Sequence, residues 1–410
     1  MVVLSIGLLF LLTPLVWVYS VAGLSLSPSH WRKYIPYYII AIAIVAYSYN
    51  PVGAPDLVRY FEMLDKSSNM TLAQVNEYFH DGLVIKNSIF WFFGHLGDNH
   101  LLPAFSVGVV YGVATYITCD LAENYEVTKW IPVILLYQFM VLPLISITNN
   151  IRNIFAFSLI ILATYLDSVK KKRNIWVLAL YILPCFVHTS GVILIFFRVL
   201  AIVAKKIKIP ALCAGIFLST IINWLYVNIR IFAGTGGVNT IIRSLITKGY
   251  WYLNDKETTA WARTVAASGT SQAIRFVMMT VMLIFIVLIY YNAKKQYEKS
   301  SCSTFSTFMY LVCIIALACN AITTPQYWRF AAACNIMSAA VFIPILKNWK
   351  KSQKYIRIIV MLLTVCMVML FALYVRSSSY NTNFGDLLGN VFLNNIYVIT
   401  YRFLRGLVFF

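Results

Sequence analysis

The chain has 410 residues, of which 60% are hydrophobic and 11% are charged, and its formal net charge is +19. This composition excludes an ordinary water-soluble protein, because soluble domains have roughly 25% charged residues. Several apolar runs also reach about 18 residues, the length of a membrane-spanning helix. In a membrane protein the positive charge is first a signal of topology, and it gives no reason to expect a nucleic-acid partner.

Apolar runs recur along the whole chain and predict an all-α polytopic membrane protein with about 12–13 transmembrane helices. Residues 1–410 then form a single transmembrane domain. The runs lie at 2–22, 35–49, 101–118, 130–147, 153–168, 175–187, 190–204, 209–228, 273–292, 304–321, 329–346 and 357–375, with a weaker one at 391–406. No basic residue precedes the first run, so we expect a retained helix rather than a cleaved signal peptide.

Only two stretches between the apolar runs are long enough to form structure outside the membrane. The first, 50–100, is expected to be an outer loop with interfacial helices. The second, 229–272, has glycine-rich ends and an aromatic centre at Tyr250, Trp251 and Tyr252. It is typical of a mobile lid, although a plain solvated loop fits equally well.

The sequence gives no signal for a metal or a cofactor. Its eight cysteines show no CxxC spacing, so disulfides and a structural zinc are not expected. Walker A, GxSxG and HExxH motifs are also absent from the sequence.

The segment 175–204 is either one long helix or two short ones joined near His188. With two passes, the Lys/Arg clusters near 32, 170, 205, 294 and 350 all fall on one side of the membrane. With one pass, the last two clusters move to the outside, against the tendency of positive loops to stay in the cytoplasm. We therefore expect a broken-helix hairpin whose turn lies near the outer surface or dips into the bilayer.

This topology leaves the inner side rich in lysine and places eight arginines on the outer side. They are Arg59, Arg152, Arg230, Arg243, Arg263, Arg275, Arg329 and Arg376. Arginine binds phosphate through a planar fork of donors, so an outer pyrophosphate is the simplest ligand that would need several of them. The alternative is that each one reaches lipid headgroups or pairs with the acidic residues of its own loop.

Asp56 and Tyr60 follow a segment, 51–55, in which two prolines and a glycine end the second predicted helix. They are four residues apart and so share a face of an interfacial helix expected at 57–65. The Asp56 carboxylate could take a proton from an acceptor hydroxyl or bind sugar, with Arg59 as a pairing partner. The alternative is a plain helix N-cap.

Asn149 and Arg152 lie in a short outer turn that enters a helix. The free N–H groups and positive dipole end of a helix N-terminus favour an anion. This turn is therefore the strongest single candidate for an anion site.

His188 lies in the hairpin turn, in the sequence Cys185 to Gly191. The pKa of a histidine lies near neutrality, so this side chain could act as a general base or donate a hydrogen bond to phosphate. The alternative is a histidine with a purely structural role.

A second short outer loop, 323–330, also feeds a helix and contains Tyr327 and Arg329. Its aromatic residues could line the membrane interface or stack on sugar rings. Arg275 begins another helix on the same side.

Taken together, these motifs resemble the EpsG/Wzy-type bacterial polysaccharide polymerases. The resemblance rests on D-x3-Y (Asp56, Tyr60), on N-x-x-R-x-x-x-A (Asn149, Arg152, Ala156), on the basic turn KKKR at 170–173, and on F-x-H-T-S beginning at Phe186. These motifs cover about residues 45–200 in the order and spacing of the family. The later Tyr-Trp-Arg-Phe at 327–330 is a weaker match.

The resemblance implies a multi-pass protein of the bacterial inner membrane with a GT-C-like architecture and a site that faces the periplasm. Such polymerases join undecaprenyl-pyrophosphate-linked oligosaccharide repeat units, so donor and acceptor lipids are the expected partners and no cofactor is implied. O antigen is favoured over capsule or exopolysaccharide as the commoner product. Whether a chain-length regulator protein also binds is left open.

For this activity we expect Arg152 to stabilise the departing pyrophosphate, with Arg329 and Arg275 assisting. His188 and Asp56 are rival candidates for the base, and Arg59, Tyr60, Asn149 and Tyr327 are expected to bind substrate. A flippase for the same lipid-linked unit is the main alternative. A membrane-bound O-acyltransferase would explain an embedded histidine but not the arginines.

Overall fold

The structure is a computed structural model that describes residues 13–49, 51, 56–142, 144–206, 277–289, 303–320, 324–347 and 354–381. The regular structure of these residues is entirely helical, which confirms the predicted all-α class. The α-helices are α2 (Thr13–Leu26), α3 (Trp31–Tyr47), α4 (Asp56–Ser67), α5 (Leu72–Phe79), α6 (Val84–His95), α7 (Leu101–Asn124), α8 (Ile131–Val141), α9 (Leu144–Asn149), α10 (Ile151–Ser168), α11 (Ile175–Ile182), α12 (Gly191–Lys206), α17 (Ser303–Asn320), α18 (Thr324–Lys347) and α19 (Lys354–Asn381), with short 3-10 helices η1 (Pro28–His30), η2 (Thr128–Trp130) and η3 (Leu183–Phe186). A further apolar helix covers Val277–Ile289.

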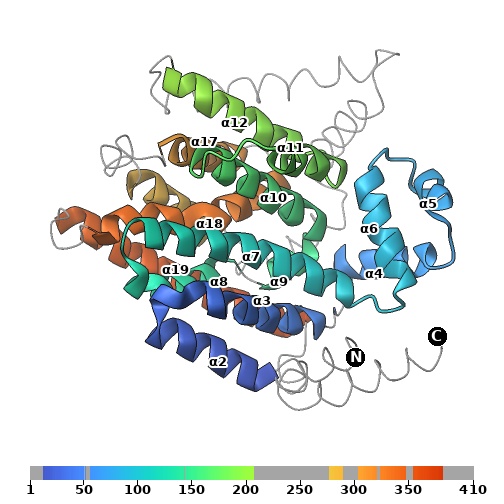
Figure 1. Ribbon diagram of the computed structural model, residues 1–410, viewed down its shortest axis with the longest axis horizontal. Helices are drawn as coiled ribbons and strands as arrows, with labels where there is room; N and C mark the ends of the chain where they lie inside the picture. The colour runs from blue at the N-terminus through green and yellow to red at the C-terminus, as the bar shows by residue number, and fades with distance from the viewer. Residues whose placement is uncertain are drawn as a thin grey trace.

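Three of the described helices are long and apolar enough to cross a membrane: α7, α10 and residues Tyr327–Lys347 of α18. Six shorter apolar helices accompany them. In Figure 1, α7 lies at the centre of the bundle, between α3 on one side and α10 and α18 on the other. This arrangement is the one expected of a polytopic membrane protein, in which several apolar helices pack side by side.

The apolar run at 130–147, predicted as one helix, is divided in the structure into α8 and α9. Pro143 in the sequence cannot donate the backbone hydrogen bond that a continuous helix needs. The carbonyl oxygens at the end of α8 are satisfied by side chains instead. Leu142 O accepts from the hydroxyl of Tyr111, and Val141 O accepts from Asn335 Nδ2 at 2.8 Å.

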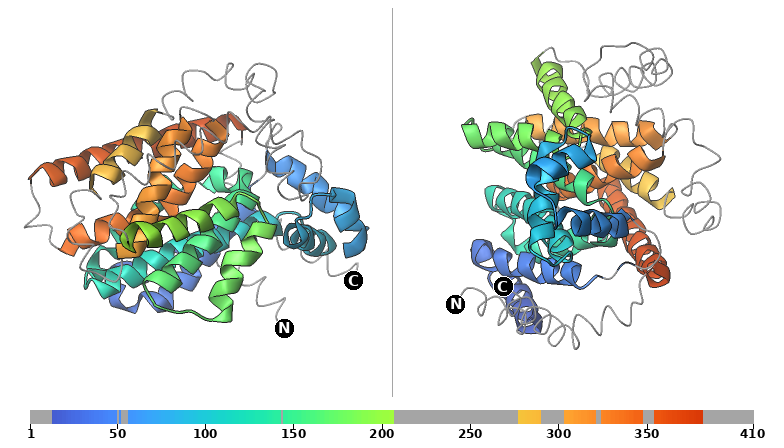
Figure 2. Two further views of the ribbon diagram at one scale, coloured as in Figure 1. Left: turned by 90° about the horizontal axis from the view of Figure 1, so that it is seen from above. Right: turned by 90° about the vertical axis from the view of Figure 1, so that its right-hand side faces the viewer.

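The segment 175–204 is broken into two helices, as the distribution of charge predicts. Asn174 caps the first of them, because its side-chain oxygen accepts the Val177 N–H at 3.1 Å. Both views of Figure 2 show α11 lying across the direction of α10. The second helix begins at Gly191, where a Cβ would lie 2.9 Å from Ile160 Cδ1 of α10. The small residue therefore allows the turn of the hairpin to lie close against α10.

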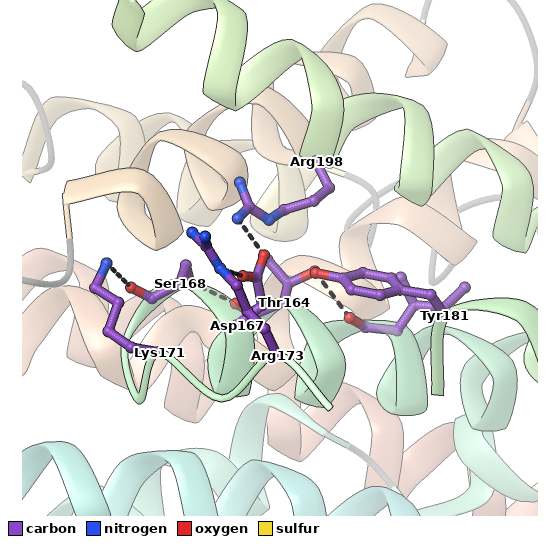
Figure 3. Close-up of polar contacts among 8 residues, drawn as sticks. Thr164, Asp167, Ser168, Lys171, Arg173, Tyr181 and Arg198 are labelled. Carbon is purple, nitrogen blue, oxygen red and sulfur yellow. Dashed lines mark hydrogen bonds and ion pairs between the residues drawn. The ribbon is translucent and has the colours of Figure 1, made fainter. Parts of the chain in front are cut away.

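A polar cluster joins both arms of this hairpin to the end of α10 (Figure 3). The Asp167 carboxylate forms ion pairs with Arg198 of α12 and with Arg173, the latter at 3.2 Å. The hydroxyl of Tyr181 in α11 donates to Thr164 Oγ1 at 3.4 Å. Because Arg198 is almost fully buried, its ion pair with Asp167 is shielded from water and fixes the hairpin against α10.

Helices α4, α5 and α6 form a cap over one end of the bundle (Figure 1). They occupy the segment 50–100, and α4 covers the helix predicted at 57–65. Helix α5 begins with a capping box, in which Thr71 and Gln74 bond reciprocally through their side chains and backbone N–H groups. The leucine, tyrosine and phenylalanine side chains of α4 and α6 pack together as a separate small core that includes Leu57, Leu64 and Phe93.

The opposite end of α7 and the turn just after it contain three acidic residues that form ion pairs with basic residues of other segments. Asp120 pairs with Lys170 at 2.7 Å, Glu123 with Arg32 at 2.6 Å, and Glu126 with Lys347 at 3.3 Å. Three of the basic clusters that the sequence predicts on one side of the membrane thus meet at the end of the bundle remote from the α4–α6 cap.

Gly94 sets the distance between α4 and α6. A Cβ at this position would lie 2.7 Å from the backbone oxygen of Leu64, which cannot move aside as a flexible side chain would. Gly94→Ala should therefore force the two helices apart and destabilise the protein by about 1–3 kcal/mol. Thermal unfolding of the purified protein in detergent measures this effect. The matched control is Gly108→Ala, whose Cβ would meet Ala43 Cβ at an ordinary 3.5 Å; equal midpoints for the two variants would contradict the prediction.

Candidate active site

A small hollow of about 20 Å³, part of it open to the outside, lies beside the cap at the junction of α6, α7, α10 and the hairpin turn. Aliphatic and aromatic side chains form most of its wall, among them Phe105 and Phe155. The polar residues in the wall are Lys86, Ser106 and Arg152. An otherwise apolar hollow with two cationic residues in its wall is a candidate binding place for an amphipathic anion.

Arg152 reaches this hollow from the first turn of α10. Its Nε donates to the hydroxyl of Tyr60 at 3.3 Å, and its guanidinium carbon lies 5.1 Å from the centre of the Tyr60 ring. Tyr60 is itself buried in α4, where its ring packs against Phe90 of α6 at 5.9 Å. The cap thus fixes the guanidinium group through Nε and the ring face, and the two terminal nitrogens remain available for a ligand.

The local balance of charge favours an anion. Asp56 and Asp81 are the carboxylates whose charges act on the Arg152 cation. Asp56 already pairs with Arg59 at 3.2 Å, and Asp81 already pairs with Lys86. These five residues comprise three cations and two carboxylates, so the group has a net charge of +1 before any ligand binds. The N-terminus of α10 adds the positive end of its dipole.

Asp56 and Arg59 lie at the exposed rim of the cap rather than in the wall of the hollow. Asp56 is the first residue of α4, where its negative charge interacts favourably with the positive end of the helix dipole. Of the predicted pair on one helix face, only Tyr60 is buried. The structure therefore brings Asp56, Arg59, Tyr60 and Arg152 into one neighbourhood, with Tyr60 as the direct link to Arg152.

His188 is buried in the hairpin turn, and its neighbour Val187 is part of the wall of the hollow. The backbone N–H of Ser190 donates to His188 Nδ1 at 3.2 Å. A nitrogen that accepts a hydrogen bond carries no proton, so the neutral ring must carry its proton on Nε2. In this form Nε2 of His188 is a hydrogen-bond donor.

Two polar side chains close to Arg152 have an oxygen without a hydrogen-bond partner among the described residues. One is the Asn149 Oδ1 at the end of α9, and the other is Ser106 Oγ in the wall of the hollow. Buried polar atoms are usually bonded, so groups of this kind are typical of a site that a ligand or water completes.

The remaining predicted residues lie elsewhere. Tyr327 is fully buried in the main core, where its hydroxyl bonds to Thr280 Oγ1 at 2.9 Å. Arg329 is half-buried in α18, beside Phe330, which stacks on Phe157 of α10. Neither residue is in the wall of the hollow as far as the structure describes it. Arg275, the lid-like loop 229–272 and the runs at 209–228 and 391–406 lie outside the described residues.

Sequence reasoning did not identify Lys86 and Ser106 as site residues. The signal for Lys86 was present, because it is a single lysine among apolar residues of α6, on the same helix face as Ile89 and Phe90. Ser106 gave no signal, since a serine within an apolar helix is common.

A family model described as the EpsG family matches residues 32–385, which is most of the chain. No curated protein and no solved structure matches.

Proposed function

The chain belongs to the EpsG family, and from this membership we propose that it is a polysaccharide polymerase of the bacterial inner membrane. It joins undecaprenyl-pyrophosphate-linked oligosaccharide repeat units at the periplasmic face. As the product we propose O antigen. The apolar helices and the family together make the chain a membrane protein of polysaccharide biosynthesis.

The observation that carries this proposal is the position of Arg152. Its guanidinium group lies at a helix N-terminus, in the wall of an apolar hollow, and is held by Tyr60 through Nε and the ring face. A lipid-linked pyrophosphate has an apolar tail and an anionic head, which match this wall and this charge. Among described residues no carboxylate forms an ion pair with Arg152, so none of these carboxylates competes for its terminal nitrogens.

In the proposed reaction the growing chain is the donor and the incoming repeat unit is the acceptor. The bond between the anomeric carbon of the donor and the pyrophosphate oxygen breaks, and the bonding electron pair leaves with undecaprenyl pyrophosphate. The acceptor hydroxyl oxygen forms the new glycosidic bond and gives up its proton. Activation is already present in the donor, so neither ATP nor a nucleotide sugar takes part.

Arg152 stabilises the charge that develops on the leaving pyrophosphate, in the way that fixed donors stabilise an oxyanion. His188 donates a hydrogen bond from Nε2 to the same leaving group, a role supported by the Ser190 N–H bond to Nδ1. The proton of the acceptor hydroxyl then goes to the other candidate base, Asp56. Positioning both lipids at one depth in the bilayer supplies the proximity that the reaction needs.

The other predicted residues have supporting roles in this proposal. Arg59 holds the Asp56 carboxylate, Tyr60 holds Arg152, and Asn149 offers its unpartnered oxygen to a sugar hydroxyl. Arg275, Arg329 and Tyr327 are proposed to act on the more distant part of the substrate.

We also propose a GT-C-like architecture with about 12–13 membrane passes. In it the α4–α6 cap, over 50–100, and the loop 229–272 lie on the periplasmic side. This orientation is supported by the other end of α7, where Arg32, Lys170 and Lys347 form ion pairs. Basic residues favour the cytoplasmic side of a membrane. A chain-length regulator protein is a further proposed partner.

The direct test is polymerisation by the purified protein in lipid nanodiscs supplied with a defined undecaprenyl-pyrophosphate-linked repeat. The expected result is a ladder of products that persists in excess chelator, because the leaving group is stabilised by side-chain cations. The matched control supplies the repeat on undecaprenyl monophosphate and should give no ladder. A protein that forms no ladder with the pyrophosphate donor contradicts the proposed activity, and a ladder abolished by chelator contradicts catalysis without a metal.

A further inference from the structure

Lys86 is the most deeply buried charged side chain of the hollow. It belongs to α6 and is only 2% exposed, although a lysine side chain is almost always found at the surface. Its ammonium group lies 4.3 Å from the centre of the Phe79 ring and forms an ion pair with Asp81. Asp81 precedes α6, so the two charged groups come from adjacent parts of the cap.

The two members of this ion pair are not equivalent. The Asp81 side chain is 22% exposed and also accepts the backbone N–H of Leu83 at 3.1 Å, so it is partly solvated and bonded without Lys86. Lys86 is enclosed, and it lines the hollow together with Arg152. A buried pair of this kind adds little stability compared with apolar residues of the same volume, because desolvation of the charges costs about as much as their attraction returns. A purely structural role therefore does not account for a lysine at this position.

We infer that Lys86 is the second cation of the diphosphate site, with Asp81 as its counter-ion in the absence of ligand. This inference rests on the proposed function and adds the residue that recognises the second phosphate group of its ligand. Arginine binds one phosphate group through its fork, and lysine supplies a point charge to the other. Ser106 Oγ, which has no partner among described residues, lies in the same wall and completes the set of donors.

The binding of farnesyl diphosphate to the purified, detergent-solubilised protein tests this inference, with farnesyl monophosphate as the comparison ligand. Lys86→Met removes the charge and keeps the volume, and should weaken farnesyl diphosphate binding by about tenfold or more. Binding of farnesyl monophosphate, which Arg152 can hold alone, should change by less than about threefold. Lys86→Arg keeps the charge and should retain most of the affinity.

The double variant Asp81→Asn/Lys86→Met separates ligand binding from structure. It replaces the ion pair by two neutral groups, and the new side-chain amide keeps an oxygen for the Leu83 N–H. We expect its thermal unfolding midpoint to match the wild type and its diphosphate affinity to remain as low as that of Lys86→Met. Recovery of wild-type diphosphate affinity in the double variant would overturn the inference, because the lysine would then serve only to neutralise Asp81.

The same measurements distinguish failure of this inference from failure of the proposed function. If the wild type prefers diphosphate over monophosphate and Lys86→Met keeps that preference, the assignment of Lys86 is wrong and the polymerase proposal stands. If the wild type binds neither ligand, the proposed pyrophosphate site itself is wrong.

Discussion

Replacing Arg152 with alanine is expected to lower the rate of polymerisation by about 10²–10³-fold, the usual effect of removing one group that stabilises the charge of a transition state. The fixed geometry of the guanidinium group is the reason, because Tyr60 holds Nε and leaves the terminal nitrogens for the pyrophosphate. Cells that carry the variant in place of the wild type should display glycans of a single repeat unit. Electrophoresis of the extracted surface glycan measures the loss of the ladder.

Two further variants test whether the effect is specific to the guanidinium group of Arg152. Arg152→Lys keeps the charge but not the fork, and should recover only part of the activity. Lys66→Ala removes an exposed cation from the same cap, where the lysine bonds to Tyr78, and should keep the full ladder. If Arg152→Ala abolishes even single exported units, the protein is a flippase for the lipid-linked repeat and not a polymerase.

The second large effect is expected at His188, where two substitutions separate the acceptor role of Nδ1 from the donor role of Nε2. Asparagine reproduces the position of Nδ1 and can still accept the Ser190 N–H, but it offers no donor in place of Nε2. Glutamine reaches the position of Nε2 with an N–H donor but loses the acceptor. If the ring acts as a donor to the leaving group, His188→Asn should lose about 10²–10³-fold in kcat, whereas His188→Gln should retain a larger share.

The stability of each variant completes this test. His188→Asn keeps the hydrogen bond of the turn, so its thermal unfolding midpoint should remain close to that of the wild type. His188→Gln should unfold at a lower temperature while it keeps more activity. The opposite order, with the asparagine variant the more active, would show that the ring matters for the turn and not as a donor.

Several features of the site can be predicted from sequence because each depends on a local pattern. The sequence predicts Arg152 at the start of a helix, and the structure puts it at the first turn of α10. The alternation of basic clusters predicts the hairpin at 175–204, because it reflects the sidedness of a membrane rather than any contact within the protein. Neither of these predictions requires knowledge of which side chains are in contact.

Other features depend on residues far apart in the chain. Tyr60 and Arg152 are separated by 92 positions, and only the packing of α4 on the start of α10 brings them together. Tyr327, expected to bind sugar, is in the core because α18 packs beside the helix that carries Thr280. Lys86 and Arg152 line one hollow because α6 and α10 both pack against η3 of the hairpin.

The amino-acid pattern alone determined that this protein is helical and that it belongs in a membrane, and it predicts that its arginines and lysines divide between two sides. The physical reason is that unpaired backbone groups and charges are unfavourable at every position in lipid. The composition of each segment therefore indicates whether that segment lies in the membrane. Only the tertiary structure decided which charged residues, Lys86 and Arg152, line the same hollow. That choice depends on the packing of side chains between helices, which burial and close contact determine and which no single segment contains.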